Sequence, residues 1–200
     1  MNKPGYFSSL AGEWEALHSR KRESDALRRL AGAFRLDKGD RVLDAGCGTG
    51  RLCPFLRERV GPRGRIIELD FAADMLRICR GKIKHRRTGF VQADSENLPF
   101  PESVFDAVIC FSLFPHLDRP RDAAREFFRV LVPGRKAFIA HLMSREELNL
   151  MHRRASGPVR HDRLPGAPEM RDILGAAGFE GVQIVDRPGW YFAEAKRPAL

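Results

Sequence analysis

Residues 41–70 read RVLDAGCGTGRLCPFLRERVGPRGRIIELD, and this stretch decides the fold. An apolar run reaches Asp44 and is followed by a loop in which glycine and other small residues surround Cys47. A segment with helical periodicity comes next, and a second apolar run ends in Asp70. This order is typical of a β-α-β unit, in which a helix joins two parallel strands.

The same alternation continues along the chain and ends in a hairpin. Strands are predicted at 41–46, 64–70, 89–94, 104–112 and 136–142, and helices at 51–60, 73–81, 120–131 and 168–178. Segments 182–187 and 191–197, joined through Pro188 and Gly189, predict the two strands of the hairpin. We therefore predict an α/β fold, a Rossmann-like, doubly wound, mostly parallel seven-stranded sheet with a C-terminal antiparallel hairpin strand and an N-terminal helical cap.

The composition indicates a soluble globular chain, with 43% hydrophobic and 30% charged residues. A net charge of +9 raises nucleic acid as a partner, but the densest basic stretch, residues 77–87, lacks aromatic residues that could stack on bases. We therefore expect a solvated basic surface rather than a nucleic-acid site. The sequence shows no transmembrane segment and no signal peptide, so a cytoplasmic monomer or homodimer is expected.

Four cysteines, Cys47, Cys53, Cys79 and Cys110, occur without a CxxC pair. Zinc sites need clustered ligands, and these cysteines are not clustered in the sequence. We therefore expect reduced, partly buried thiols and no metal.

The glycine loop lacks the sequence features of two common phosphate-binding motifs. A P-loop needs a lysine in GK[ST], whereas the six residues from Gly46 read GCGTGR. The dinucleotide fingerprint needs a third glycine where Arg51 stands. Asp44 would repel a pyrophosphate and attract an ammonium or sulfonium group, so the loop favours a cationic ligand. The strand-ending Asp44, Asp70 and Asp94 could together suit a metal, or each could take a separate donor on one extended ligand.

The quoted loop resembles the nucleotide-binding motif of class I S-adenosylmethionine (SAM) dependent methyltransferases. Three later segments resemble the type 11, ubiquinone/menaquinone-biosynthesis-like branch: IIELDFAADML (66–76), FVQADSENLPFPESVFDAVICFSLFPHL (90–117) and AAREFFRVLVPGRKAFI (123–139). In the last of these, Arg135 stands where a second glycine is usual. The resemblance implies methyl transfer from SAM to a small-molecule acceptor, with release of S-adenosylhomocysteine. The alternatives are an RNA or protein methyltransferase and a non-catalytic SAM-binding module.

The resemblance also implies a cofactor site, and the residue types suit it. Gly46 and Gly48 let the backbone approach the ligand closely. Asp44 would bind its ammonium group, and Asp70 can accept two hydrogen bonds from the ribose diol. The remaining expected cofactor residues are Cys47 in the loop, Phe71 and Met75 against the adenine, Asp94 and Ser95 at the adenine amino group, and Phe111 at the end of the fourth strand.

The acceptor side is expected after the fifth strand. Ser144 and Glu147 form an S-x-x-E capping box, so a helix is predicted to begin directly after Ser144. Asn149 and His152 then share one helical face, and His141 ends the strand before it. These three residues are the predicted catalytic set, able to orient and deprotonate an acceptor or to ligate a metal. The alternative is a surface helix whose polar residues are solvated.

We expect one domain of 200 residues: a helical cap over 1–38, a SAM-binding core over 39–142, and an acceptor-side helix, lid loop and hairpin over 143–200. His116 follows the fourth strand, where it can line the pocket or simply pack, and the packing role is slightly favoured. The loop 155–168 and the aromatic residues Tyr6, Phe7 and Trp14 are expected to be able to close the site.

Overall fold

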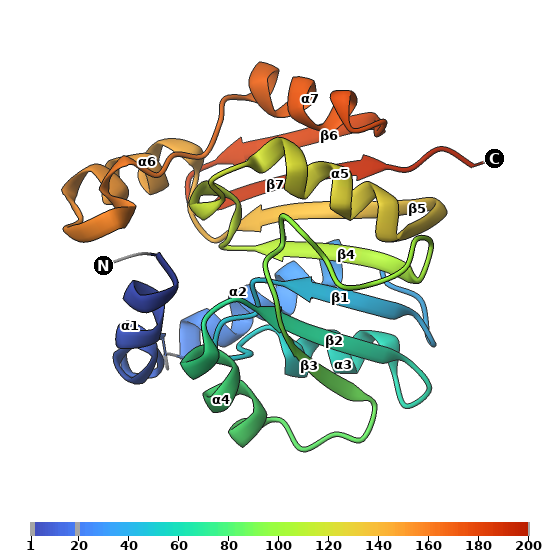
Figure 1. The fold of residues 1–200 in the computed structure, drawn as a ribbon, viewed down its shortest axis with the longest axis horizontal. Helices are drawn as coiled ribbons and strands as arrows, with labels where there is room; N and C mark the ends of the chain where they lie inside the picture. Colours follow the sequence, from blue (N-terminus) through green and yellow to red (C-terminus); the bar gives the residue numbers. More distant parts are fainter. Residues whose placement is uncertain (1–2, 19–20, 200) are drawn as a thin grey trace.

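A seven-stranded sheet forms the centre of the protein, as Figure 1 shows for this computed structural model. Its strand order is β3-β2-β1-β4-β5-β7-β6. Strands β3, β2, β1, β4 and β5 pair in parallel, and β7 pairs antiparallel with both β5 and β6. The predicted fold class, including the hairpin, is confirmed. The strands are β1 (Arg41–Ala45), β2 (Arg65–Asp70), β3 (Thr88–Gln92), β4 (Phe105–Phe111), β5 (Leu131–His141), β6 (Glu180–Arg187) and β7 (Trp190–Lys196).

The helices cover both faces of the sheet, and each face has its own apolar core. Helices α5 and α7 pack on one face through side chains such as Phe127 and Ile173. Helices α2 and α3 pack on the other face through side chains such as Leu30 and Leu56. The helices are α1 (Lys3–His18), α2 (Lys21–Ala33), α3 (Cys53–Val60), α4 (Ala73–Lys82), α5 (Pro120–Val130), α6 (Arg145–Arg154) and α7 (Ala167–Ala176), with short 3-10 turns η1 (Phe114–His116) and η2 (Gly157–His161).

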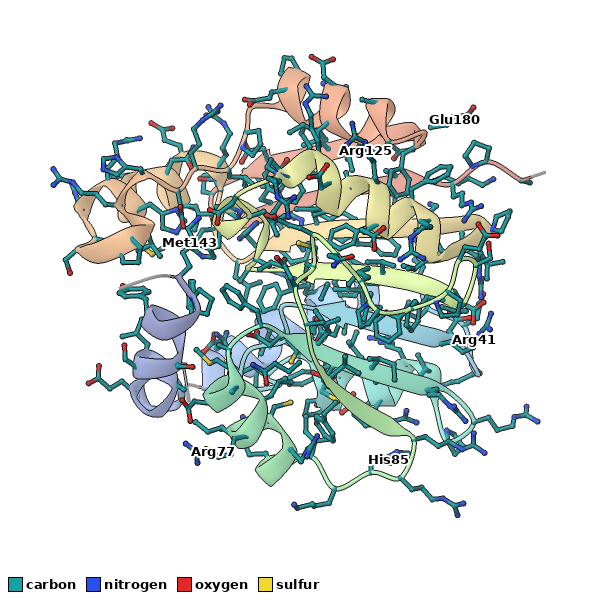
Figure 2. All side chains as sticks on the ribbon, viewed as in Figure 1. Arg41, Arg77, His85, Arg125, Met143 and Glu180 are labelled. Carbon is teal, nitrogen blue, oxygen red and sulfur yellow. The ribbon has the colours of Figure 1, made fainter. Side chains whose placement is uncertain are left out.

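The structure describes residues 3–18 and 21–199, with the side chains of 14–18 and 21–22 outside this description. The expected part of Trp14 in closing the site therefore lies outside the described side chains. Within the described residues, no helix combines the length and apolar character needed to cross a bilayer. Figure 2 shows the labelled Arg77 and His85 near the edge of the molecule.

The strand order reverses between β1 and β4, which lie side by side at the middle of the sheet (Figure 1). In an open parallel sheet, ligands bind beyond the carboxyl ends of the strands at such a switch point. Helix α1 lies at this end, packed against α4. The topology thus places the glycine loop after β1 and the segment after β4 around one crevice.

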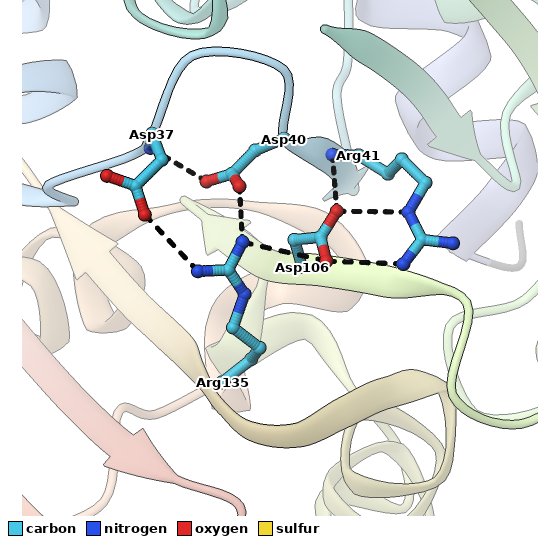
Figure 3. A network of polar contacts seen from close by, with 5 residues as sticks. All are labelled: Asp37, Asp40, Arg41, Asp106 and Arg135. Carbon is cyan, nitrogen blue, oxygen red and sulfur yellow. Dashed lines mark hydrogen bonds and ion pairs between the residues drawn. The ribbon is translucent and has the colours of Figure 1, made fainter.

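The opposite end of the sheet is cross-linked by Arg135, which stands where the family resemblance leads one to expect glycine (Figure 3). Its guanidinium bonds to Asp40 and lies 3.3 Å from an oxygen of Asp37 and 3.6 Å from one of Asp106. Asp106 also accepts hydrogen bonds from the backbone and side chain of Arg41, at 2.9 and 3.0 Å. The substitution therefore adds an ionic network that joins β1, β4 and β5 away from the crevice.

The segment predicted to be a lid loop is built into the structure. Residues 157–161 form η2, Val159 is buried, and Leu164 is fully buried. This segment is rich in glycine and proline, but its apolar residues Val159 and Leu164 pack into the protein. It forms part of the wall of the site rather than an open connector.

Candidate functional site

The glycine loop after β1 is held by hydrogen bonds from three consecutive backbone N–H groups. Those of Gly46 and Cys47 donate to the Leu69 carbonyl, at 2.8 and 2.9 Å. That of Gly48 donates to Oδ2 of Asp70, at 2.8 Å. Gly46 has φ of +74°, and a Cβ there would lie 2.8 Å from Leu113. Glycine is therefore required for this conformation and for the close approach.

Two buried carboxylates lie at this loop. Asp70 accepts hydrogen bonds from the N–H groups of Gly48 and Ala72, at 2.8 and 2.9 Å. Burial raises the pKa of Asp70, and these hydrogen bonds offset only part of that increase. Asp44 is 1% exposed and its Oδ1 has no hydrogen-bond partner. Burial, together with the charges of Glu68 and Asp70, raises the pKa of Asp44 well above its usual value. A cationic ligand in the neighbouring cavity would favour the charged form of this carboxylate, which suits the sulfonium and ammonium charges of SAM.

The predicted cofactor residues surround two adjoining cavities, with one exception. The exception is Asp44, in β1, which is not among the residues that line them. Phe71 and Gly46 border both cavities. The first is also lined by Cys47, Gly48, Asp70, Met75 and Phe111, and the second by Asp94 and Ser95.

A larger cavity of about 480 Å³ lies beside the cofactor site. Its walls are largely apolar and aromatic, with Tyr6 and Phe7 contributed by α1. Three histidines line it: His141 from the end of β5, His152 from α6, and His116 from η1. The structure thus brings His141 and His152 together, as the spacing predicted, and adds His116 to them. The remaining wall includes Leu10, Met143, Leu148, Met151 and Val159.

Asp162 fixes the orientation of two of these histidines. Its Oδ2 lies 2.7 Å from Nδ1 of His116, and its backbone carbonyl lies 3.0 Å from Nδ1 of His152. Both partners are acceptors, so each Nδ1 carries the proton and each Nε2 is left as an acceptor. Burial alone would raise the pKa of Asp162, but hydrogen bonds from His116 and Lys3 outweigh it and lower that pKa.

His141 and His152 are each only 2% exposed, and the Nε2 of His141 has no hydrogen-bond partner. Burial lowers the pKa of His141 to about 3, with smaller contributions from His116 and His152. Its ring lies 6.1 Å from that of Tyr191, in an edge-on arrangement. His141 is therefore a neutral imidazole at physiological pH, which can form hydrogen bonds with a ligand but not an ion pair.

Asn149 does not line the cavity. Its side-chain amide donates to the Leu164 carbonyl at 3.1 Å and accepts from the Leu164 N–H at 2.7 Å. Both ends of the amide are thus used to hold the segment after η2. The capping box predicted one turn earlier is present: Ser144 accepts from the Glu147 N–H, and Glu147 accepts from that of Ser144.

The N-terminal helix closes one side of the site. Lys3 Nζ lies 3.0 Å from Asp162 and 2.7 Å from Asp118, and donates to the His116 carbonyl at 2.9 Å. The ring of Phe7 lies 5.0 Å from that of His116 and 6.0 Å from that of Phe71. Helix α1 therefore touches the acceptor-side histidine and the cofactor side at once.

The cofactor site and the larger cavity share a wall. Phe111 and Ser112 border both, at the end of β4, and Ser112 has a positive φ of 55°. Arg51, Phe7 and His116 also border both cavities. A group held in the larger cavity would therefore lie next to a ligand held by the glycine loop.

Three contributors to this site were not among the predicted site residues. His116 follows the fourth strand, and this position gave a signal for it. Asp162 stood out only as a charged residue in a loop, and nothing in the sequence pointed to Lys3. Their roles depend on contacts between segments far apart in the chain, such as the Lys3 ion pair with Asp162.

Comparison with known proteins agrees with the resemblance to methyltransferases that the sequence motifs indicate. Residues 43–139 match the family described as a methyltransferase domain. The ubiquinone/menaquinone biosynthesis C-methyltransferase UbiE of Edwardsiella ictaluri is 36% identical over 143 residues, 66% of this chain and 56% of that protein. Its counterpart from Pseudomonas aeruginosa is 34% identical over 155 residues, 72% of this chain and 59% of that protein. The chain thus spans a little over half of the length of these relatives.

The fold is also shared with solved methyltransferases. A SAM-dependent methyltransferase from Aquifex aeolicus superimposes with a TM-score of 0.73 over 98% of both chains, at 22% identity. Residues 43–139 therefore carry a methyltransferase domain of the same family as the UbiE relatives, built on the fold of the SAM-dependent methyltransferases.

Proposed function

We propose that this protein transfers a methyl group from SAM to a small-molecule acceptor and releases S-adenosylhomocysteine. The shared wall between the glycine-loop site and the histidine-lined cavity carries the proposal. SAM would supply an electrophilic methyl group on a sulfonium centre. The protein then has to hold the acceptor in line and, where the acceptor carries a proton, remove it.

The cofactor residues have separable roles in this proposal. Gly46, Cys47 and Gly48 would lie along the ligand, and Asp70 both braces the loop and faces the cavity. Asp44, in β1 and outside the cavity lining, would attract the positively charged groups of SAM. The remaining contributors are Phe71, Met75 and Phe111, which offer apolar surface, and Asp94 with Ser95, which border the second cavity.

The larger cavity supports a proposal for the class of methyl acceptor. Its apolar and aromatic walls suit a planar, aromatic molecule, and its three imidazoles suit a hydroxyl substituent on that molecule. We infer a phenol or hydroquinone acceptor methylated on carbon, in keeping with the UbiE relatives, which are ubiquinone/menaquinone biosynthesis C-methyltransferases. In this proposal the Nε2 of His116, whose Nδ1 contacts Asp162, would accept the proton, and His141 and His152 would orient the hydroxyl. Asn149 positions the surrounding segment through Leu164.

The cofactor part of the proposal is tested by calorimetry with SAM and S-adenosylhomocysteine. Asp70→Ala should weaken binding at least tenfold, because it removes the brace on the Gly48 N–H as well as a ligand-facing carboxylate. Asp74→Ala on α4, whose carboxylate pairs with exposed Arg77, is the matched control and should bind like the wild type. If neither ligand binds the wild type, the proposal fails.

The acceptor part is tested by turnover with a short-chain hydroquinone and labelled SAM. His116→Gln and Asp162→Asn should each lower kcat by about 10²–10⁴, the usual contribution of a positioned base, and should lower SAM affinity far less than kcat. Asp162→Asn should also shift the pH profile of kcat, since it removes the charge beside His116. Transfer of label to RNA or to protein, with none to the hydroquinone, would favour the alternative substrate classes instead.

A further inference from the structure

Three side chains that are far apart in the sequence meet beneath the glycine loop. Cys47 comes from the loop, Glu68 from β2 and Cys79 from α4. Their ligand atoms all lie within 4.8 Å of one another. Their separation in the sequence hid this cluster, and the packing of α4 against β2 creates it.

Glu68 is an unusual residue for this position in the core. It is fully buried, with 0% exposure, and with Asp70 it is one of two buried carboxylates in a strand whose other buried residues are Ile66 and Leu69. Its Oε2 lies 3.8 Å from Cys79 Sγ, and its Oε1 accepts no hydrogen bond. Lys82, near the end of α4, attracts it electrostatically. A buried carboxylate oxygen without a hydrogen bond is costly unless a cation binds it.

We propose that Cys47, Glu68 and Cys79 bind a thiophilic divalent metal ion of the zinc class. Two thiolates and a carboxylate are ligands that zinc accepts, at about 2.3 Å from sulfur and about 2.0–2.2 Å from oxygen. Tetrahedral binding at these lengths brings two sulfurs to about 3.8 Å, so the cluster needs only a small contraction. Cys53 is fully buried and interacts with Glu68, but its sulfur is not one of the three ligand atoms that lie within 4.8 Å of one another, so the fourth position is left to an external ligand such as water.

The carboxylate distinguishes this site from a disulfide. Cys47 and Cys79 interact with each other, so their oxidation to a disulfide is the competing use of the two thiols. A disulfide would leave Glu68 buried with Oε1 still unpaired, whereas a metal ion engages all three groups. The observations therefore favour the metal site.

The location gives the ion a structural effect. It would connect the glycine loop to β2 and α4. Its ligand Glu68 lies two residues before Asp70, which accepts a hydrogen bond from Gly48 of the same loop. The ion would lie behind the loop, with Cys47 the only one of its three ligands among the residues that line the cofactor cavity. Bound metal should therefore raise the melting temperature without taking part in methyl transfer.

The experiment uses the full chain, reduced with a phosphine and freed of metal, and titrated with Cd²⁺ as the probe. A thiolate-to-cadmium charge-transfer band should grow and saturate at one equivalent, and the melting temperature should rise. Competition with a chelator then gives the affinity, and Zn²⁺ should displace the band. These readouts need neither SAM nor an acceptor, so they can fail independently of the proposed methyl transfer.

Variants make the assignment specific. Cys79→Ser and Glu68→Gln should each lower Cd²⁺ affinity at least tenfold. Cys47→Ser changes a less buried residue of the loop and should lower the affinity by a similar factor, so it serves as the test if a core variant fails to fold. Cys110→Ala is the matched control, because Cys110 is a fully buried thiol of β4 outside the cluster, and it should retain the band. Absence of a one-equivalent band in the reduced wild type, or a band that survives in Cys47→Ser and Cys79→Ser, would overturn the proposal.

Discussion

Acid should destabilise this protein through His141, by an amount that follows from its environment. Burial lowers the pKa of His141 from 6.5 to about 3 in the folded protein. The unfolded chain therefore binds a proton at this residue in a pH range where the native state does not. Stability from the neutral ring is fully present above about pH 6.5 and is lost progressively as the pH falls toward 3.

The magnitude follows from the two pKa values. Each pH unit within this window costs about 1.4 kcal/mol, so the loss between about pH 6 and pH 4 amounts to roughly 2.5 kcal/mol. His116 and His152 face the same ring and oppose its protonation further, and Tyr191 packs against it. The full window of about 3.5 units corresponds to an upper limit near 5 kcal/mol.

Urea denaturation at a series of pH values checks this expectation in the wild type and in His141→Gln. The difference in unfolding free energy between the two proteins should fall by about 2.5 kcal/mol between pH 6 and pH 4, because only the wild type carries the buried imidazole. His161→Gln removes an exposed histidine from η2 and serves as the control. A difference that stays constant over this range would refute the assignment of a buried, neutral His141.

Three further predictions concern single side chains. Gly46→Ala should weaken SAM binding at least tenfold in calorimetry, because the new Cβ would lie 2.8 Å from Leu113 at a positive φ; unchanged affinity would contradict the close approach. Asn149→Ala should lower the unfolding free energy by about 2–4 kcal/mol, since it strands the N–H and carbonyl of buried Leu164, with the loss measured in urea; a loss below about 0.5 kcal/mol would contradict this role. Arg135→Ala should lower the unfolding free energy by about 1–2 kcal/mol, because it leaves the buried carboxylate of Asp40 without its ion-pair partner. If the melting temperature of the variant depends on salt concentration in the same way as that of the wild type, the ion pair does not contribute as expected.

The sequence by itself determined the order of elements and predicted most of the residues that line the two candidate cofactor cavities. The alternation of apolar and amphipathic segments predicted the parallel sheet, because each period reflects which face of an element is buried. The strand-ending residues were predictable for the same reason, since the carboxyl ends of parallel strands meet at one edge. The capping box of Ser144 and Glu147 was readable because it depends on neighbours three residues apart.

Only the tertiary structure decided what depends on contacts between distant segments. It joined Asp162 to His116 and Lys3, and it turned Asn149 toward the Leu164 backbone instead of the cavity. It also gathered Cys47, Glu68 and Cys79, three residues that no local pattern relates. The physical reason is that helix and strand periods report burial but not which buried faces meet, and that choice is made by the packing of the whole chain.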